Sequence, residues 1–311
     1  MNVREAAEKL VAISEKEGAT QAEAFAILAK TKSIYIDDNI PKITDSKTEL
    51  GVGLKFIIGK KIGYTSSTLV SESPNEVVVR AKAMASISNE DPRFDSLPDP
   101  KKPSGSLNRF YNTKTAEADS AYLLDNAMQV VDAAVSENVS VPNGVLRSSS
   151  IDFHIQNSLG INAGSKSTMV FGHFTAKSED SGTVGEGVQR CWSRSIHDVD
   201  FVQIGQKLKS QALAVLRAEP FKDKWEKIVA VLAPSEGSEM LGSLIGFAAS
   251  AEAVNNKSSP WTDKVGDRVA HENLTVLDNG LSETGLLSAV IDDEGTPTQT
   301  TPVIEKGVLK S

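Results

Sequence analysis

A proline-rich segment, residues 91–106, constrains this chain of 311 residues more than any other feature. It holds four of the twelve prolines, at positions 92, 98, 100 and 103. Proline fixes its own φ angle and lacks the backbone N–H, so this segment can sustain neither a helix nor a strand ladder. We therefore predict a domain boundary here, with one domain in residues 1–103 and a second in residues 104–311.

The first domain is predicted to combine helices with an antiparallel sheet. Asn2 and Glu5 form a capping pair that opens a helix ending at Gly18, and Ser73 with Glu76 opens another that ends near residue 88. Between these helices, turn residues separate several short segments, and short turns favour antiparallel pairing of the segments. Their β-branched and aromatic content predicts strands at 22–29, 33–36, 51–58 and 61–66.

The second domain is predicted to be rich in sheet, with flanking helices. Apolar and polar residues alternate on both sides of a turn at 157–160, which predicts a β-meander that continues to about residue 187. The expected strands are 145–156, 167–177, 227–232 and 286–291, and the expected helices are 116–137, 201–217 and 238–254. The predicted fold class is therefore α+β, in two domains.

The composition excludes several classes of function. A formal net charge of −8 and a pI near 5.2, with no basic run longer than a pair, argue against a protein that binds nucleic acid through its phosphates. The single cysteine, Cys191, cannot form an intrachain disulfide. Because we find neither a signal sequence nor an apolar run of transmembrane length, we expect a cytoplasmic protein without membrane contact.

Three consecutive carboxylates, Asp292, Asp293 and Glu294, precede a turn that begins with Gly295 and Thr296. They follow the predicted strand 286–291, so they are expected where a strand gives way to a turn. Neighbouring carboxylates can raise one another's pKa and act as acid or base, or they can bind a divalent cation. A solvated acidic turn without a chemical role is the third interpretation. The residues alone leave these alternatives open.

Other catalytic and metal-binding patterns are weak. The four histidines are scattered, and Thr275 stands where the second histidine of a zinc-protease helix would follow His271. Cys191 and His197 predict a thiol–imidazole pair only if the fold brings them together, and an inert packed thiol is the expected alternative. The spacing therefore predicts no zinc site.

The C-terminal residues carry a family resemblance. Residues 292–297, followed by 304–310, resemble the most specific stretch of the TldD/PmbA family, long described as modulators of DNA gyrase. Residues 51–63 resemble the hairpin of that family's first domain, and the proline-rich segment falls where the family changes domain. The resemblance implies a two-domain fold, a dimer and a role in the proteolysis of peptides and small or unfolded proteins.

The resemblance also separates two branches of the family by their chemistry. The TldD branch is implied to hold zinc through a His-Glu-x-x-x-His helix and a later Cys, with the Glu as base. Here the matching residues are Ser235, Glu236 and Met240, so Glu236 is expected to be a relic of that base and no metal is expected in this chain. The chain resembles the PmbA/TldE branch, which lacks the motif and partners the catalytic subunit.

The resemblance therefore implies a non-catalytic subunit whose partner is a TldD-like zinc subunit or a second copy of this chain. The substrate-binding residues that it implies, as the wall of a peptide groove, are Asp292, Asp293, Glu294, Gly295 and Thr296. Family members continue beyond residue 311, so we expect a fragment or a divergent member. Two alternatives stay open. One is a peptidase or hydrolase that uses this cluster with Glu236 and a divalent ion, and the other is a module that binds gyrase or another partner.

Overall fold

The computed structural model describes residues 2–68, 73–103, 105–220, 222, 224 and 226–311. The chain forms two compact units, and each is described by itself. Unit 1 comprises Met1–Ala218 together with Ser282–Thr298, and unit 2 comprises Glu219–Leu281 together with Gln299–Ser311. The combination of helices with antiparallel sheets confirms the predicted α+β class.

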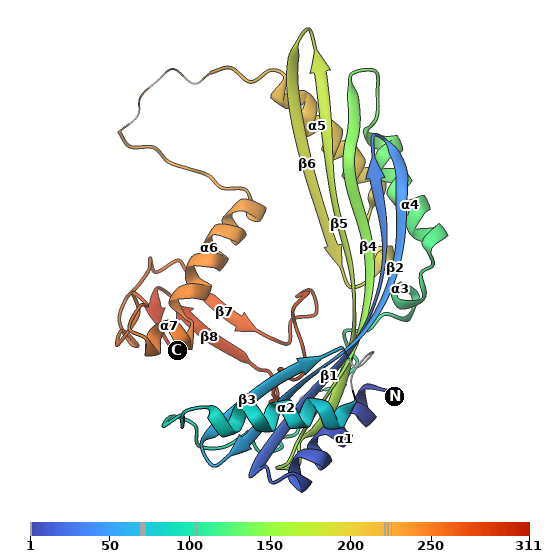
Figure 1. Cartoon of the computed structure of the whole chain (residues 1–311). Helices are drawn as coiled ribbons and strands as arrows, with labels where there is room; N and C mark the ends of the chain where they lie inside the picture. The colour runs from blue at the N-terminus through green and yellow to red at the C-terminus, as the bar shows by residue number, and fades with distance from the viewer. Residues whose placement is uncertain (1, 69–72, 104, 221, 223, 225) are drawn as a thin grey trace. The chain divides into compact units, whose positions relative to one another are not determined.

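Within the described residues, unit 1 is built on a six-stranded antiparallel sheet with the order β3-β2-β1-β4-β5-β6 (Figure 1). β1 pairs with β4 along nearly its whole length, so one sheet joins residues from both sides of the proline-rich segment. The domain limits 1–103 and 104–311 stay a prediction. The strands are β1 (Gln21–Asp37), β2 (Ile40–Ile58), β3 (Lys61–Ser67), β4 (Val139–Asn157), β5 (Asn162–Asp180) and β6 (Thr183–Ser193).

Two tight turns connect the first three strands at the positions that the sequence predicts. Asp38 and Asn39 join β1 to β2 with φ angles of 49° and 66°, a conformation that these residue types tolerate well. Gly59, with φ of 62°, joins β2 to β3. The predicted strands 22–29 and 33–36 form one continuous strand, β1, and the predicted strand 51–58 is the end of the longer β2, which begins at Ile40. Both are longer than predicted because β1 and β2 supply backbone partners to one another along their lengths.

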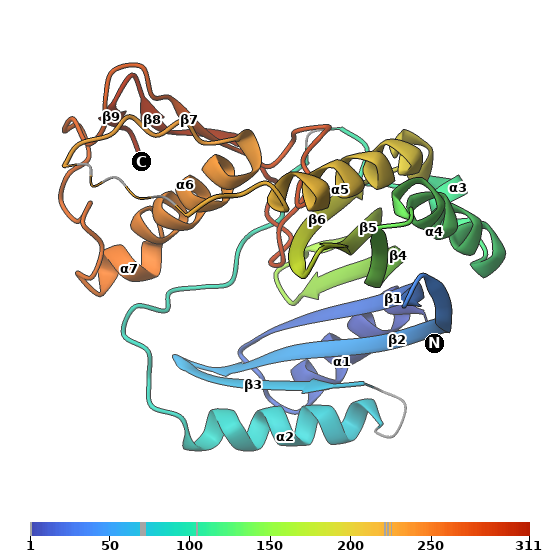
Figure 2. The ribbon, with the colours of Figure 1, turned by 90° about the horizontal axis from the view of Figure 1, so that it is seen from above.

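Two helices cover one face of β1–β3 (Figure 2). They are α1 (Val3–Lys16) and α2 (Pro74–Ile87). Both begin at the predicted capping boxes, in which the side chains of Asn2 and Ser73 accept a backbone N–H of the first turn. The two helix predictions are confirmed.

The alternation of side chains along β1 places its residues on two different faces. Ala22, Ala24 and Ala26 are fully buried in the core that α1 and α2 share with the sheet. Since successive side chains of a strand point to opposite faces, Glu23 and Phe25 lie on the other face. That second face carries the candidate site.

Toward the other end of the sheet, α4 (Ser120–Ala134) and α5 (Phe201–Val215) pack over a core formed with β1, β4 and β5. The predicted helix 201–217 is confirmed as α5. The predicted helix 116–137 is wrong at its start, because α3 (Thr113–Glu117) ends there and a new helix begins. Asp119 caps α4 by accepting the backbone N–H of Tyr122.

In the part of unit 2 that the structure describes, two helices accompany a small sheet in the order β7-β8-β9. Its core gathers the buried side chains of Val303, Ile304 and Leu309, with Ile245 and Trp261 packed against them. The predicted helix 238–254 is two helices, and the first begins four residues earlier. Of the helices in the described residues, none is long and apolar enough to cross a membrane. The elements are α6 (Pro234–Ala248), α7 (Ala251–Asn255), β7 (Val276–Asn279), β8 (Thr300–Glu305) and β9 (Val308–Leu309).

The predicted strand at 227–232 is wrong. Residues 226–233 form neither helix nor strand, and the side chains of Val229 and Val231 are 93% and 92% exposed. A strand needs a neighbouring backbone for its hydrogen bonds, and residues 227–232 pair with no strand of the described chain. The apolar sequence of this segment therefore does not by itself produce a strand.

Candidate functional site

The 282–298 segment belongs to unit 1 and packs on the sheet face that bears Phe25. Ile291 is buried there in a cluster with Ile155 and Ile161. Phe25 packs against the same cluster and stacks on Phe153, with ring centroids 5.4 Å apart. These apolar contacts fix the residues that immediately precede the acidic turn.

Arg194, on the loop after β6, holds the 282–298 segment by bonding backbone carbonyl groups of that segment. Its Nη2 atom donates to the carbonyl oxygens of Gly285 at 3.0 Å, of Ser288 at 2.8 Å and of Leu286. Its guanidinium group lies 4.7 Å from the ring centroid of Phe110. The predicted strand 286–291 is wrong, because carbonyl groups that bond a side chain are not available to a strand ladder.

The acidic turn itself is shaped by Asp292 and Gly295. Asp292 Oδ1 accepts the backbone N–H groups of Glu294 at 3.0 Å and Thr296 at 2.8 Å. Gly295 has φ of 79°, and a Cβ atom there would lie 2.5 Å from Cγ2 of Ile161. Only glycine fits this combination of left-handed backbone and close packing. Asp292 and Gly295 therefore shape the turn, and the carboxylates of Asp293 and Glu294 stay exposed.

The turn brings Glu294 to a pair of charged residues on the sheet. Glu23 on β1 lies directly opposite Lys55 on β2, and Lys55 Nζ is 2.7 Å from Glu23 Oε1. The same Nζ atom is 2.5 Å from Glu294 Oε1. Glu23 is only 4% exposed, whereas Lys55 is 24% and Glu294 is 52% exposed. One ammonium group thus joins a buried carboxylate to a half-exposed one.

Burial determines the protonation behaviour of this cluster. Desolvation raises the pKa of Glu23, the bond to Lys55 opposes that effect, and the charges of Glu294 and Asp292 add to it. For Lys55, burial lowers the pKa, but the bonds to Glu23 and Glu294 outweigh it and the pKa is raised. Lys55 is therefore charged at neutral pH, and Glu23 is a carboxylate that is costly to ionise.

These residues line a pocket of about 320 Å³, which we call the acidic pocket. Asp293 and Glu294 contribute from the turn, Glu23 and Lys55 from the sheet, and Phe25 and Tyr64 add aromatic surface. Tyr64 lies on the edge strand β3, directly opposite Lys55. The pocket thus combines charged and aromatic groups from four segments of the chain.

The acidic pocket contains only part of the predicted substrate-binding set. Asp293 and Glu294 line it, whereas Asp292, Gly295 and Thr296 act in the turn. The substrate-binding role of all five residues stays a prediction. Sequence reasoning missed Glu23 and Lys55; a single carboxylate in the otherwise apolar run 22–29 was the available signal.

The predicted relic of a zinc site lies on α6 in unit 2. Ser235 Oγ donates to Glu236 Oε2 at 2.5 Å, and this hydrogen bond is the main reason that the pKa of Glu236 is lowered. Met240 is 49% exposed. A hydroxyl, a carboxylate and a thioether do not fit a zinc ion, which prefers imidazole and thiolate ligands. Among the described residues, no three or more His, Cys, Asp or Glu side chains form a metal-binding group.

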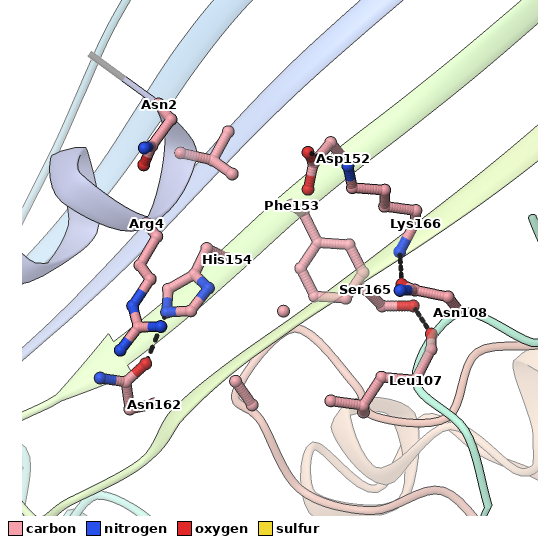
Figure 3. A pocket seen from close by; sticks show the side chains of 13 residues that line it. Asn2, Arg4, Leu107, Asn108, Asp152, Phe153, His154, Asn162, Ser165 and Lys166 are labelled. Atoms are coloured by element: carbon pink, nitrogen blue, oxygen red, sulfur yellow. Dashed lines mark hydrogen bonds and ion pairs between the residues drawn. The ribbon is translucent and has the colours of Figure 1, made fainter. Parts of the chain in front are cut away.

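A second cavity of unit 1, of about 580 Å³, lies beside the N-terminus of α1 (Figure 3). His154 Nε2 lies 2.8 Å from Asn162 Oδ1, and Lys166 Nζ lies 3.2 Å from a carboxylate oxygen of Asp152. Arg4 reaches the lining too, but its Nε atom donates to Glu8 at 2.8 Å. Burial lowers the pKa of His154, so its ring is neutral at pH 7. The charged groups of this cavity are already paired with one another or with neighbours.

Three family models match the chain in sequence order. Residues 22–85 match domain 1 of the PmbA/TldA metallopeptidases, residues 109–216 match the central domain and residues 226–311 match the C-terminal domain. Together the three segments cover most of the chain. The proline-rich segment falls between the first and second of them.

Two individual relatives match the chain over most of its length. The chain is 25% identical to an uncharacterized protein of Methanocaldococcus jannaschii over 98% of its own length and 69% of the relative. It is also 25% identical to a metalloprotease of the same organism, over 84% of the chain and 58% of that protein. The chain thus spans 58% to 69% of the length of these relatives.

A solved structure shows the same fold. The crystal structure of TldE from Thermococcus kodakarensis matches with a TM-score of 0.84 and 20% identity, over 98% of this chain and 68% of that one. The order of the three matched segments and this shared fold lead to one assignment: the chain belongs to the TldD/PmbA family of metallopeptidase-like proteins.

Proposed function

We propose that this chain is a non-catalytic, TldE/PmbA-like subunit of a TldD/PmbA-type metalloprotease that acts on peptides or small unfolded proteins. The observation that carries the proposal is the composition of α6, where Ser235 and Met240 flank Glu236 and no zinc-binding donor set is present. A carboxylate without an activated water beside it has no route to attack a peptide bond. The chemistry then belongs to a partner subunit.

The partner in this proposal is a TldD-like subunit that holds zinc, or a second copy of this chain, in the cytoplasm. The contribution of this chain is to bind and orient an extended peptide. The acidic pocket supports that role, because it lies beside the edge strand β3. Glu90 pairs with the outer edge of β3 at Lys61, and the backbone groups farther along, near Tyr64, can pair with an extended peptide. Asp293 and Glu294 would then face the peptide as part of the wall.

Metal analysis and peptide cleavage together test the proposal. The purified chain should contain no stoichiometric zinc and should not cleave an unstructured peptide. A mixture with a TldD-like subunit should cleave it, and chelation should abolish that activity. A Glu236→Gln variant in the same mixture should cleave at the wild-type rate, because Glu236 is a relic. One zinc ion per chain, with chelator-sensitive cleavage by the chain alone, would refute the proposal.

The alternative of a carboxylate-based hydrolase with a divalent ion gains no support from the acidic turn. Asp292 Oδ1 already accepts two backbone N–H groups, and Glu294 is paired with Lys55. A divalent cation needs several oxygen ligands together, and among the described residues no three carboxylate, imidazole or thiol side chains are placed to hold one. Titration calorimetry with Mn²⁺, Mg²⁺ and Ca²⁺ separates the two proposals, because the subunit proposal expects no heat of binding.

A further inference from the structure

The acidic pocket contains a buried carboxylate oxygen without a partner. Glu23 is 4% exposed, and its Oε1 atom is bonded to Lys55. Its Oε2 atom has no hydrogen-bond partner among the described residues. A buried carboxylate oxygen ordinarily accepts at least one hydrogen bond, and leaving it unpaired destabilises the fold. The unpaired Oε2 is itself buried, so a donor can reach it only when neighbouring side chains of the pocket move.

The charges around Glu23 determine which kind of donor the pocket favours. Glu23, Asp293 and Glu294 supply three carboxylates, and Lys55 supplies the one ammonium group among the charged residues that line the pocket. The negative excess also appears in the pKa of Glu23, which Glu294 and Asp292 raise further after burial. A cation entering the pocket would reduce this repulsion, whereas an anion would increase it.

The size and the walls of the pocket fit a long side chain. A volume of about 320 Å³ lies at the lower end of the range for ligand pockets, which is enough for one lysine or arginine side chain. Phe25 and Tyr64 offer aromatic surface to the methylene groups and to the cationic head. Gly53 lies directly opposite Phe25 on the neighbouring strand. The space beside the Phe25 ring is open there, since a Cβ atom on Gly53 would meet nothing within 4 Å.

We propose that the acidic pocket binds the lysine or arginine side chain of a peptide, so that this chain selects peptides with a basic residue. The cationic head would bond to Glu23 and Glu294. Entry requires the Lys55–Glu294 contact to open, and because Glu294 is half exposed, water readily replaces that contact. The inference rests on the proposed function in one respect: the ligand is taken to be a peptide.

Binding of a matched peptide series tests this selection directly. Fluorescently labelled, N-terminally acetylated peptides of identical sequence would carry lysine, arginine, norleucine, acetyl-lysine or glutamate at one central position. Titration with the full chain should show the lysine and arginine peptides binding about tenfold more tightly than the norleucine and acetyl-lysine peptides, with the glutamate peptide weakest. The preference should decrease as salt is added. The lysine and arginine arms distinguish an ammonium from a guanidinium site.

Three variants connect the preference to the pocket. Glu23→Gln should reduce the preference for the basic peptides to threefold or less, as an estimate for a charge-assisted bond replaced by a neutral one. Gly53→Val should do the same by filling the space in front of Phe25, without a change of charge. Glu179→Gln, an exposed residue at the far end of β5, makes the same change in net charge and should leave the preference intact.

The outcomes separate this inference from the proposed function. Equal affinity for the lysine and norleucine peptides, or a preference that survives both Glu23→Gln and Gly53→Val, would overturn the inference. If that happens while the mixture with a TldD-like subunit still cleaves peptides, the proposed function stands and the pocket assignment fails. If basic peptides bind but no partner restores cleavage, the pocket assignment stands alone. Circular dichroism shows whether each variant folds. If Glu23→Gln fails to fold, Gly53→Val still tests the pocket assignment.

Discussion

Replacement of Gly295 by alanine should destabilise unit 1 and move the acidic turn away from the sheet. The backbone of Gly295 has φ of 79°, where an alanine costs about 1–2 kcal/mol. The added Cβ would also lie 2.5 Å from Ile161 Cγ2 and 3.1 Å from Ile155 Cγ2, and relief of such overpacking costs about 1–3 kcal/mol. The expected loss in the free energy of unfolding is therefore about 2–5 kcal/mol.

Gly182 provides a matched control for this prediction. It has nearly the same φ angle, 83°, but a Cβ atom there would meet nothing within 4 Å. Gly182→Ala should therefore cost only the backbone term of about 1–2 kcal/mol. Denaturant unfolding followed by circular dichroism would measure both variants. Equal losses for the two variants would refute the argument that the turn is packed tightly against Ile161.

Three further predictions follow from individual residues of unit 1. Arg194→Lys should cost about 2–3 kcal/mol and make the 282–298 segment more sensitive to protease, because a lysine lacks the planar guanidinium group that lies over the Phe110 ring while it bonds the carbonyl groups of the segment. The exposed control Arg217→Lys should change neither property, and intact protease resistance in Arg194→Lys would contradict the prediction. The folded-state pKa of Glu23 is raised above 4.5, so the contribution of this residue to stability should fall as the pH rises through that raised pKa. Over the same pH range, the free energy of unfolding of Glu23→Gln should increase relative to that of the wild type. A difference between the two proteins that does not change with pH would count against the prediction. Burial raises the pKa of Cys191 to about 11, so Ellman's reagent at pH 8 should label it slowly in the native chain and quickly in denaturant, and rapid native labelling would disprove this.

Local chemistry made several elements of this fold predictable from the sequence. The capping boxes at Asn2 and Ser73 involve residues only three positions apart, and the turns at 37–39 and 59–60 depend on residue types that tolerate positive φ angles. In these caps and turns, the groups that interact lie within a few residues of one another in the sequence. These predictions are confirmed for that reason.

Apolar segments without a local partner were predicted less well. Residues 227–232 and 286–291 have the composition of strands, yet neither forms one. A strand depends on a neighbouring backbone, and for 286–291 the carbonyl groups bond Arg194 instead, roughly ninety residues earlier in the sequence. Composition alone does not reveal such a partner.

The candidate site illustrates the same limit. The acidic turn is conspicuous in the sequence, and two of its five predicted residues do line the acidic pocket. The contact that gives the pocket its character joins Lys55 to Glu294 across 239 positions of the chain. No local pattern indicates that contact, because the register of β1 against β2 and the packing of Ile291 together produce it.

The negative excess of the acidic pocket belongs to the docked 282–298 segment rather than to the sheet. On the sheet alone, Glu23 and Lys55 lie opposite one another, and their charges balance. Docking of the segment adds Asp293 and Glu294, which converts a neutral pair into a site that attracts cations. Arg194, Asp292 and Gly295 hold that segment in place without lining the pocket, so substitutions at these positions should weaken the preference for basic peptides as strongly as the loss of Glu294 itself.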